Sequence, residues 1–102
     1  MNIQFSYLYR DGANYKQFHE VIFANKQQLS IEEIESRIKA SLIDEMWFYA
    51  DKWKLEDLHH YKWDNEIDHT WHEYESIEPT EAEVTTGDIA DFLQHIELHP
   101  IK

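Results

Sequence analysis

The chain has 102 residues, and its 9 Lys and Arg against 21 Asp and Glu give a formal net charge of -12. Such a charge repels phosphate groups, which excludes a general binder of DNA, RNA or anionic lipid headgroups. The absence of cysteine excludes disulfides, thiolate nucleophiles and sulfur-ligated metal sites. A chain of this length supplies enough apolar surface for one core. We therefore expect residues 1–102 to form a single globular domain.

Two strands joined by a hairpin are predicted at the start of the chain. Between Ile3 and Tyr9 every second residue is a large apolar or aromatic one, which is typical of a strand with one buried face. Asp11 and Gly12 are residue types that hairpin turns favour. Residues 18–23 then supply the return strand.

A helix is predicted over about residues 31–43. Ser30 and Glu33 have the spacing of a capping box, in which two side chains bond otherwise unpaired amides of the first turn. Apolar residues fall on one stripe of this helix, and glutamates precede basic residues by four positions on the solvent side. Residues 46–50 are apolar and aromatic and could return as a further strand.

The second half of the chain is predicted to hold one more strand and one more helix. Residues 71–77 are rich in strand-favouring types, although neither face of this strand is uniformly apolar. Residues 78–86 have the composition of an exposed connection. Four apolar residues at helical spacing predict a closing helix over about residues 87–97. We expect its cap at Thr85 or Thr86.

The order of these elements predicts an α+β fold. Its small, mainly antiparallel sheet starts with the N-terminal β-hairpin, and two helices, about 31–43 and 87–97, pack on one face. The first residues lack the features of a signal peptide, and no apolar run approaches the length of a membrane span. The sequence therefore predicts a cytoplasmic protein without a membrane partner.

The negative charge is concentrated in one part of the chain. Residues 1–30 carry three basic and two acidic side chains, whereas the stretch from Asp64 to Glu97 has eleven carboxylates and no Lys or Arg. One interpretation is that these acids only keep a small bacterial-type protein soluble. The other is a docking face for a protein partner with a basic surface.

A more specific version of the docking hypothesis rests on two glutamates. On a strand, Glu73 and Glu75 point to the same side about 7 Å apart, which is close to the phosphate spacing along one nucleic-acid strand. A nucleic-acid-mimicking inhibitor of a DNA- or RNA-binding protein is therefore an alternative function. Direct binding of nucleic acid is not expected at this net charge.

Aromatic residues crowd into residues 47–74 of the chain. Several of them can pack in the core with their polar tips at its edge. Exposed ones would form an interface, because Trp and Tyr are enriched at the centres of protein interfaces. We predict a non-enzymatic protein-binding module that acts through an acidic and aromatic surface in residues 53–78, and self-association as a homodimer is another use of such a surface. The predicted partner-binding residues are Trp53, Trp63, Trp71, Glu73, Glu75 and Glu78.

Histidines form the remaining candidate site. His69 and His72 would converge on one side of a helix but diverge on a strand, so a small metal-binding protein that uses His69 and His72 is a further alternative. The chain has no HExxH, GxSxG or glycine-rich phosphate loop, and carboxylates are too numerous to mark a catalytic pair. No catalytic residue, metal ligand or cofactor is therefore assigned, and an enzyme is not expected.

Overall fold

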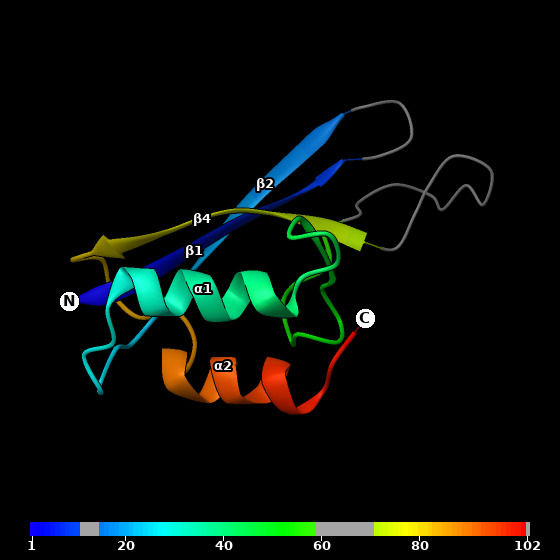
Figure 1. Ribbon diagram of the computed structural model, residues 1–102. Helices are drawn as coiled ribbons and strands as arrows, with labels where there is room; N and C mark the ends of the chain where they lie inside the picture. Colours follow the sequence, from blue (N-terminus) through cyan, green and yellow to red (C-terminus); the bar gives the residue numbers. More distant parts are fainter. Residues whose placement is uncertain (11–14, 59–70, 102) are drawn as a thin grey trace.

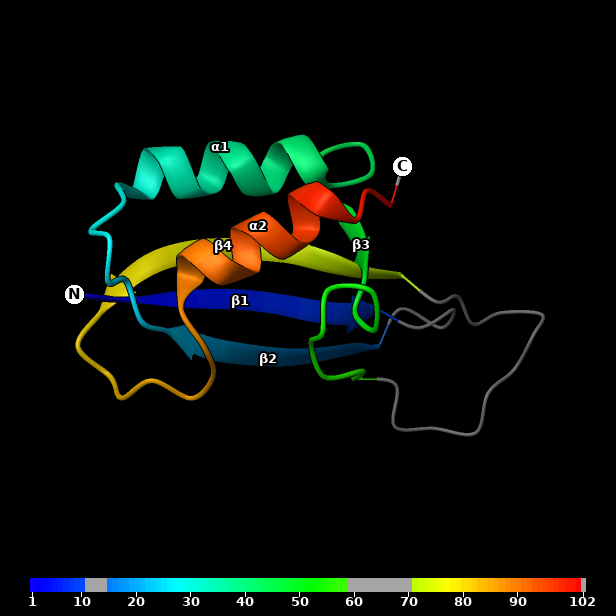
Figure 2. The same ribbon diagram turned by 90° about the horizontal axis from the view of Figure 1, so that it is seen from below.

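The computed structural model describes residues 1–10, 15–58 and 71–101. In these residues a four-stranded antiparallel sheet has the order β2-β1-β4-β3, and two helices lie on one of its faces (Figure 1, Figure 2). The α+β class and the N-terminal hairpin are thus confirmed, while the predicted turn at Asp11 and Gly12 lies outside the described residues. The strands are β1 (Asn2–Arg10), β2 (Lys16–Phe23), β3 (Trp47–Tyr49) and β4 (Trp71–Thr80), and the helices are α1 (Ile31–Ser41) and α2 (Ile89–Leu98).

The core lies between the sheet and the two helices. β1 is a central strand that pairs with both β2 and β4, and its alternating residues Ile3, Phe5, Tyr7 and Tyr9 are fully buried on the helix side. The predicted period-2 pattern therefore identifies the inner face of the sheet correctly. The helices contribute buried residues from their own apolar stripes: Ile34 and Ile38 from α1, and Ile89, Phe92, Leu93 and Ile96 from α2.

The start of α1 follows the sequence signal closely. The amide of Glu33 donates to Ser30 Oγ at 3.1 Å, as the predicted cap requires. The second bond of the predicted capping box is not formed, because the Glu33 carboxylate pairs with Arg37. Arg37 also donates two short hydrogen bonds, of 2.8 and 2.6 Å, to Glu97 on α2. These bonds hold the pKa of Glu97 below its usual value and connect the two helices at the surface.

The start of α2 differs from the prediction. Its cap is Asp88, whose carboxylate accepts from the amides of Ala90 at 3.0 Å and Lys26 at 2.9 Å. The expected cap at Thr85 or Thr86 is therefore wrong, because Asp88 serves two segments at once while Thr85 bonds to β2 instead. Among the described residues, no helix is long and apolar enough to cross a membrane.

A β-bulge in β4 explains why neither face of that strand looks uniformly apolar in the sequence. The register between β1 and β4 shifts by one residue, which leaves Glu75 as an extra residue on β4. His72 and Tyr74 precede the bulge and Ile77 follows it, yet all three lie on the inner face. The strand therefore changes its alternation halfway along without changing the face that it buries.

β4 also extends further than predicted. It continues to Thr80 through Pro79, which lies opposite Ile3 of β1. Proline has no N–H to donate, so it is tolerated where no neighbouring strand needs that donor. β3 pairs only with residues 71–73 of β4, which leaves the β3 side of Pro79 without a strand among the described residues.

Candidate functional site

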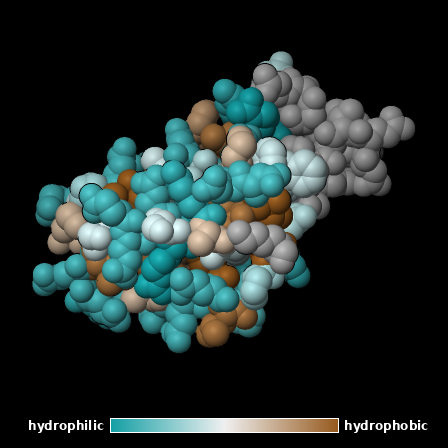
Figure 3. Space-filling model, viewed as in Figure 1, coloured by the Kyte–Doolittle hydropathy of each residue, from teal (hydrophilic) through white to brown (hydrophobic). Residues whose placement is uncertain are grey.

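Both helices lie on the same side of the sheet, so neither of them covers the opposite face (Figure 1). We call this opposite side the outer face. Hydrophilic residues make up most of the surface visible in Figure 3, as the net charge leads one to expect. The outer face contains the predicted residues of β4 and adds two from β3: Trp71, Glu73, Glu75, Glu78, Trp47 and Tyr49.

Two tryptophans of the outer face form a partly exposed aromatic pair. Trp47 of β3 and Trp71 of β4 have ring centroids 6.4 Å apart, and Trp71 remains 40% exposed. Met46, which precedes β3, is also exposed. The sequence prediction included Trp71 and missed Trp47, although the alternation of Trp47 and Tyr49 around the buried Phe48 was the signal that places both on one face.

The three predicted glutamates have different surroundings. Glu73 accepts a hydrogen bond from Arg10 Nε at 2.8 Å, and only 14% of its side chain is exposed. Glu75 and Glu78 are exposed, and neither forms an ion pair with another described residue. Of the three predicted glutamates, Glu75 and Glu78 therefore carry the free negative charge, because Arg10 neutralises Glu73.

Trp53 lies in the core, and its prediction as an exposed anchor is wrong. It is 1% exposed, and its ring stacks on Phe48 with centroids 4.6 Å apart and meets Phe92 edge-on. The flanking lysines, Lys52 and Lys54, are exposed, so Trp53 points inward between two side chains that point to solvent. Trp63, the other predicted anchor in this region, lies outside the described residues.

His72 is buried on the inner face of the sheet. The amide of Leu58 donates to its Nε2 at 3.0 Å, so this nitrogen carries no proton. Asp57 Oδ1 lies 3.5 Å from the same nitrogen. An ion pair with Asp57 would require a proton on Nε2, but Nε2 accepts the shorter bond from the Leu58 amide and therefore has none. His69 lies outside the described residues, and among those described no three metal-ligating side chains come together. The predicted pair therefore gains no support as a metal site.

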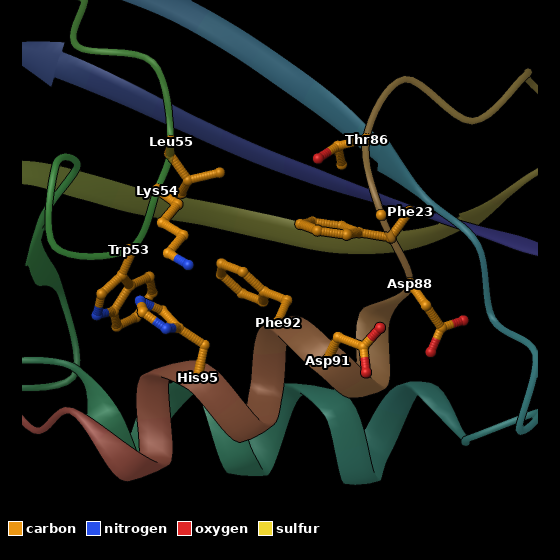
Figure 4. Close-up of a pocket in the computed structure, with 10 residues that line it drawn as sticks. Phe23, Trp53, Lys54, Leu55, Thr86, Asp88, Asp91, Phe92 and His95 are labelled. Atoms are coloured by element: carbon orange, nitrogen blue, oxygen red, sulfur yellow. The ribbon is translucent and has the colours of Figure 1, made fainter.

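A small cleft opens elsewhere, between α2, the end of β2 and the turn at residues 53–55 (Figure 4). Phe23 and Phe92 form its apolar floor, and Lys54 and Asp91 contribute charges at its rim. Its volume is about 190 Å³, whereas ligand pockets usually have roughly 300–1,000 Å³. A wider depression of about 640 Å³ shares Lys54 and His95 with the cleft, but most of its lining residues are exposed. Neither hollow is as well suited to recognition as the outer face.

Lys54 adopts a left-handed backbone conformation with φ of 58°. A residue with a Cβ atom pays about 1–2 kcal/mol to adopt this conformation, and glycine avoids that cost. Glycine is also more flexible in the unfolded chain, which cancels about 0.5–1 kcal/mol of the stabilisation. We expect Lys54→Gly to raise the free energy of unfolding by about 0.5 kcal/mol in urea denaturation. Lys52→Gly is the matched control, because φ is not positive at Lys52, and should lower it. Equal effects of both variants would contradict the strain.

Comparisons with family models, curated proteins and solved structures find no match to this chain. The basis for a functional proposal is therefore the surface of the molecule itself. The outer face is the strongest candidate, because it combines large aromatic side chains with exposed carboxylates on one sheet.

Proposed function

We propose that this chain binds another protein through the part of the outer face around Trp47 and Trp71. The observation that supports the proposal best is an aromatic pair that stays partly exposed on a sheet face that neither helix covers. Tryptophan is among the residues that contribute most to binding when a partner buries them. The proposed role is binding, without catalysis and without a cofactor.

The charges near this pair favour a partner with a basic surface. Glu75 and Glu78 are exposed on the same strand as Trp71, and the chain as a whole carries a net charge of -12. Carboxylates at the rim of an apolar contact accelerate the approach of a basic protein and disfavour acidic ones. An aromatic centre with an acidic rim is therefore the arrangement that we propose for the interface.

Mimicry of nucleic acid stays a second prediction with weaker support. It relies on adjacent free carboxylates that copy the spacing of phosphates. Of the two glutamates that suggested this spacing, Glu73 is bound to Arg10, which leaves Glu75 as the exposed member. The aromatic pair also has no counterpart in a purely electrostatic mimic, so a protein partner that buries Trp71 is preferred.

Trp71→Ala is expected to remove the partner in affinity capture from an extract of the source cells, with the purified chain as bait. The control is Leu98→Ala, which removes a side chain of α2 that is 67% exposed and lies away from the outer face. The wild type and Leu98→Ala should retain the same protein, and Trp71→Ala should lose it. Mass spectrometry of the retained proteins is the measurement.

The acidic rim is tested in the same experiment. Substituting both Glu75→Gln and Glu78→Gln should weaken retention of the same partner, and added salt should weaken retention by the wild type, because salt screens exposed charges. Retention by Trp71→Ala at the wild-type level would refute the aromatic centre. Loss of the partner with both Trp71→Ala and Leu98→Ala would show that the contact is not specific to the outer face, and would contradict the proposal.

A further inference from the structure

β2 forms one edge of the sheet, and the described residues cover only the end of this edge. The amide of Ile22 donates to Thr85 Oγ1 at 2.9 Å, so the backbone of Ile22 faces away from β1. Backbone groups alternate in direction along a strand, so Lys16, Phe18 and Glu20 direct their N–H and C=O groups to the same free side. No hydrogen bond from another described segment reaches these three residues. Within the described part of the chain, the edge is therefore open from Lys16 to Glu20.

The side chains along the open edge have a self-complementary order. Phe18 is 60% exposed on the outer face, and Lys16 and Glu20 lie two residues on either side of it on the same face. Both charged residues are exposed, and neither forms an ion pair within the described part of the chain. An exposed edge strand is a template for pairing with another strand.

We propose that two copies of this chain pair antiparallel along the open edge of β2, about a two-fold axis at Phe18. In this register Phe18 lies opposite Phe18 of the second copy. Lys16 of each copy lies opposite Glu20 of the other, which gives two such pairs. All of these are hydrogen-bonding positions, so each opposed pair exchanges two N–H···O bonds. The two sheets become one continuous sheet with an unbroken outer face.

The charge pattern selects this register over its neighbours. With a two-fold axis, a residue before the axis in one copy lies opposite the residue that is equally far after the axis in the other copy. These two residues must therefore complement each other. An axis at Lys16 would place two lysines opposite each other, and an axis at Glu20 would do the same with two glutamates. Only the axis at Phe18 gives an aromatic pair and two opposite-charge pairs, which are the cross-strand contacts that stabilise antiparallel sheets.

The location of this edge also suits an acidic chain. Residues 1–30 carry three basic and two acidic side chains, although the whole chain has a net charge of -12. Pairing through β2 therefore brings together the part of each copy that repels the other least. The interface uses the sheet edge rather than Trp47 and Trp71, so this inference does not depend on the function proposed above.

Charge reversal tests the proposal by sedimentation over a range of protein concentrations. The wild type should form dimers as the concentration rises. Lys16→Glu and Glu20→Lys each place like charges opposite each other twice, and each should weaken self-association at least about tenfold. An equimolar mixture of the two variants restores opposite charges at both positions and should dimerise. The double variant with both substitutions should dimerise alone for the same reason.

Two control variants test whether the edge of β2 forms the contact between copies. Lys26→Glu changes an exposed lysine outside β2 and should leave dimerisation as in the wild type. Trp71→Ala should also leave it unchanged, so a failure of this proposal can be told from a failure of the proposed function. A wild type that stays monomeric would overturn the proposal. Single variants that dimerise like the wild type, or a mixture and a double variant that both stay monomeric, would overturn it as well.

Discussion

Trp53→Ala is expected to lower the free energy of unfolding by about 3–5 kcal/mol, as usual when a large aromatic residue is removed from a core. Trp53 is 1% exposed. Its ring stacks on that of Phe48 with centroids 4.6 Å apart and meets the ring of Phe92 edge-on with centroids 5.7 Å apart. Its removal would leave a cavity between the sheet and α2 that these two rings cannot fill without moving. Urea denaturation followed by circular dichroism measures the effect.

Two further variants make the test specific. Trp53→Phe should cost less than Trp53→Ala, because the phenyl ring fills part of the space that alanine leaves empty. No hydrogen bond is lost in either variant, since the buried indole Nε1 has no partner among the described residues. Trp71→Ala should cost no more than about 1 kcal/mol, since Trp71 is on the outer face and partly exposed. Equal losses for Trp53→Ala and Trp71→Ala would contradict the burial of Trp53.

Deletion of Glu75 is expected to preserve cooperative folding, whereas deletion of Ser6 is expected to abolish it. Glu75 is the extra residue of the bulge, so its removal lets both halves of β4 keep their partners and their faces. Ser6 lies in the middle of β1, and its removal shifts the alternation of one half of the strand by one residue. Either Ile3 and Phe5 or Tyr7 and Tyr9 then point towards the outer face. Burial of each such side chain contributes about 1.5–3 kcal/mol.

Thermal unfolding of the two deletion variants distinguishes these outcomes. The Glu75 deletion should show one transition at a somewhat lower temperature, because the sheet loses the local twist that a bulge supplies. The Ser6 deletion should show no cooperative transition, since the lost burial is comparable with the total stability of a small domain, about 5–15 kcal/mol. A Glu75 deletion that fails to fold would show that the bulge is required rather than tolerated.

Elements that depend on nearby residues could be predicted from the sequence, and those that depend on distant ones could not. The cap of α1 is Ser30, which accepts from the amide of Glu33 three residues later, and this half of the predicted capping box is confirmed, whereas the Glu33 carboxylate pairs with Arg37 instead of the Ser30 amide. The cap of α2 is Asp88, which also binds the amide of Lys26 just after β2, so the choice over Thr85 is decided by a segment far away in the chain. The inner face of β4 likewise depends on its register with β1.

The candidate site follows the same division. Trp71, Glu75 and Glu78 are exposed, as the predicted surface requires. Alternation along a strand accounts for Trp71 and Glu75, whereas Glu78 lies on the same face only because of the bulge. The burial of Trp53 could not be read from the sequence, since the polar residues around it are typical of a surface and a tight turn directs the ring inward. The pairing of Trp47 with Trp71 required knowledge that β3 lies beside β4.

The central place of β1 in the sheet has a consequence for how the chain folds during synthesis. β1 is made first and can form its hairpin with β2 at once, but its other partner is β4, with Asn2 opposite Thr80. The apolar side of that hairpin gains its last cover only when α2 has been made. Contacts between such distant segments slow folding because a long loop must close first. The nascent hairpin therefore exposes apolar residues until α2 has left the ribosome, which makes this interval the one in which aggregation or chaperone binding is most favoured.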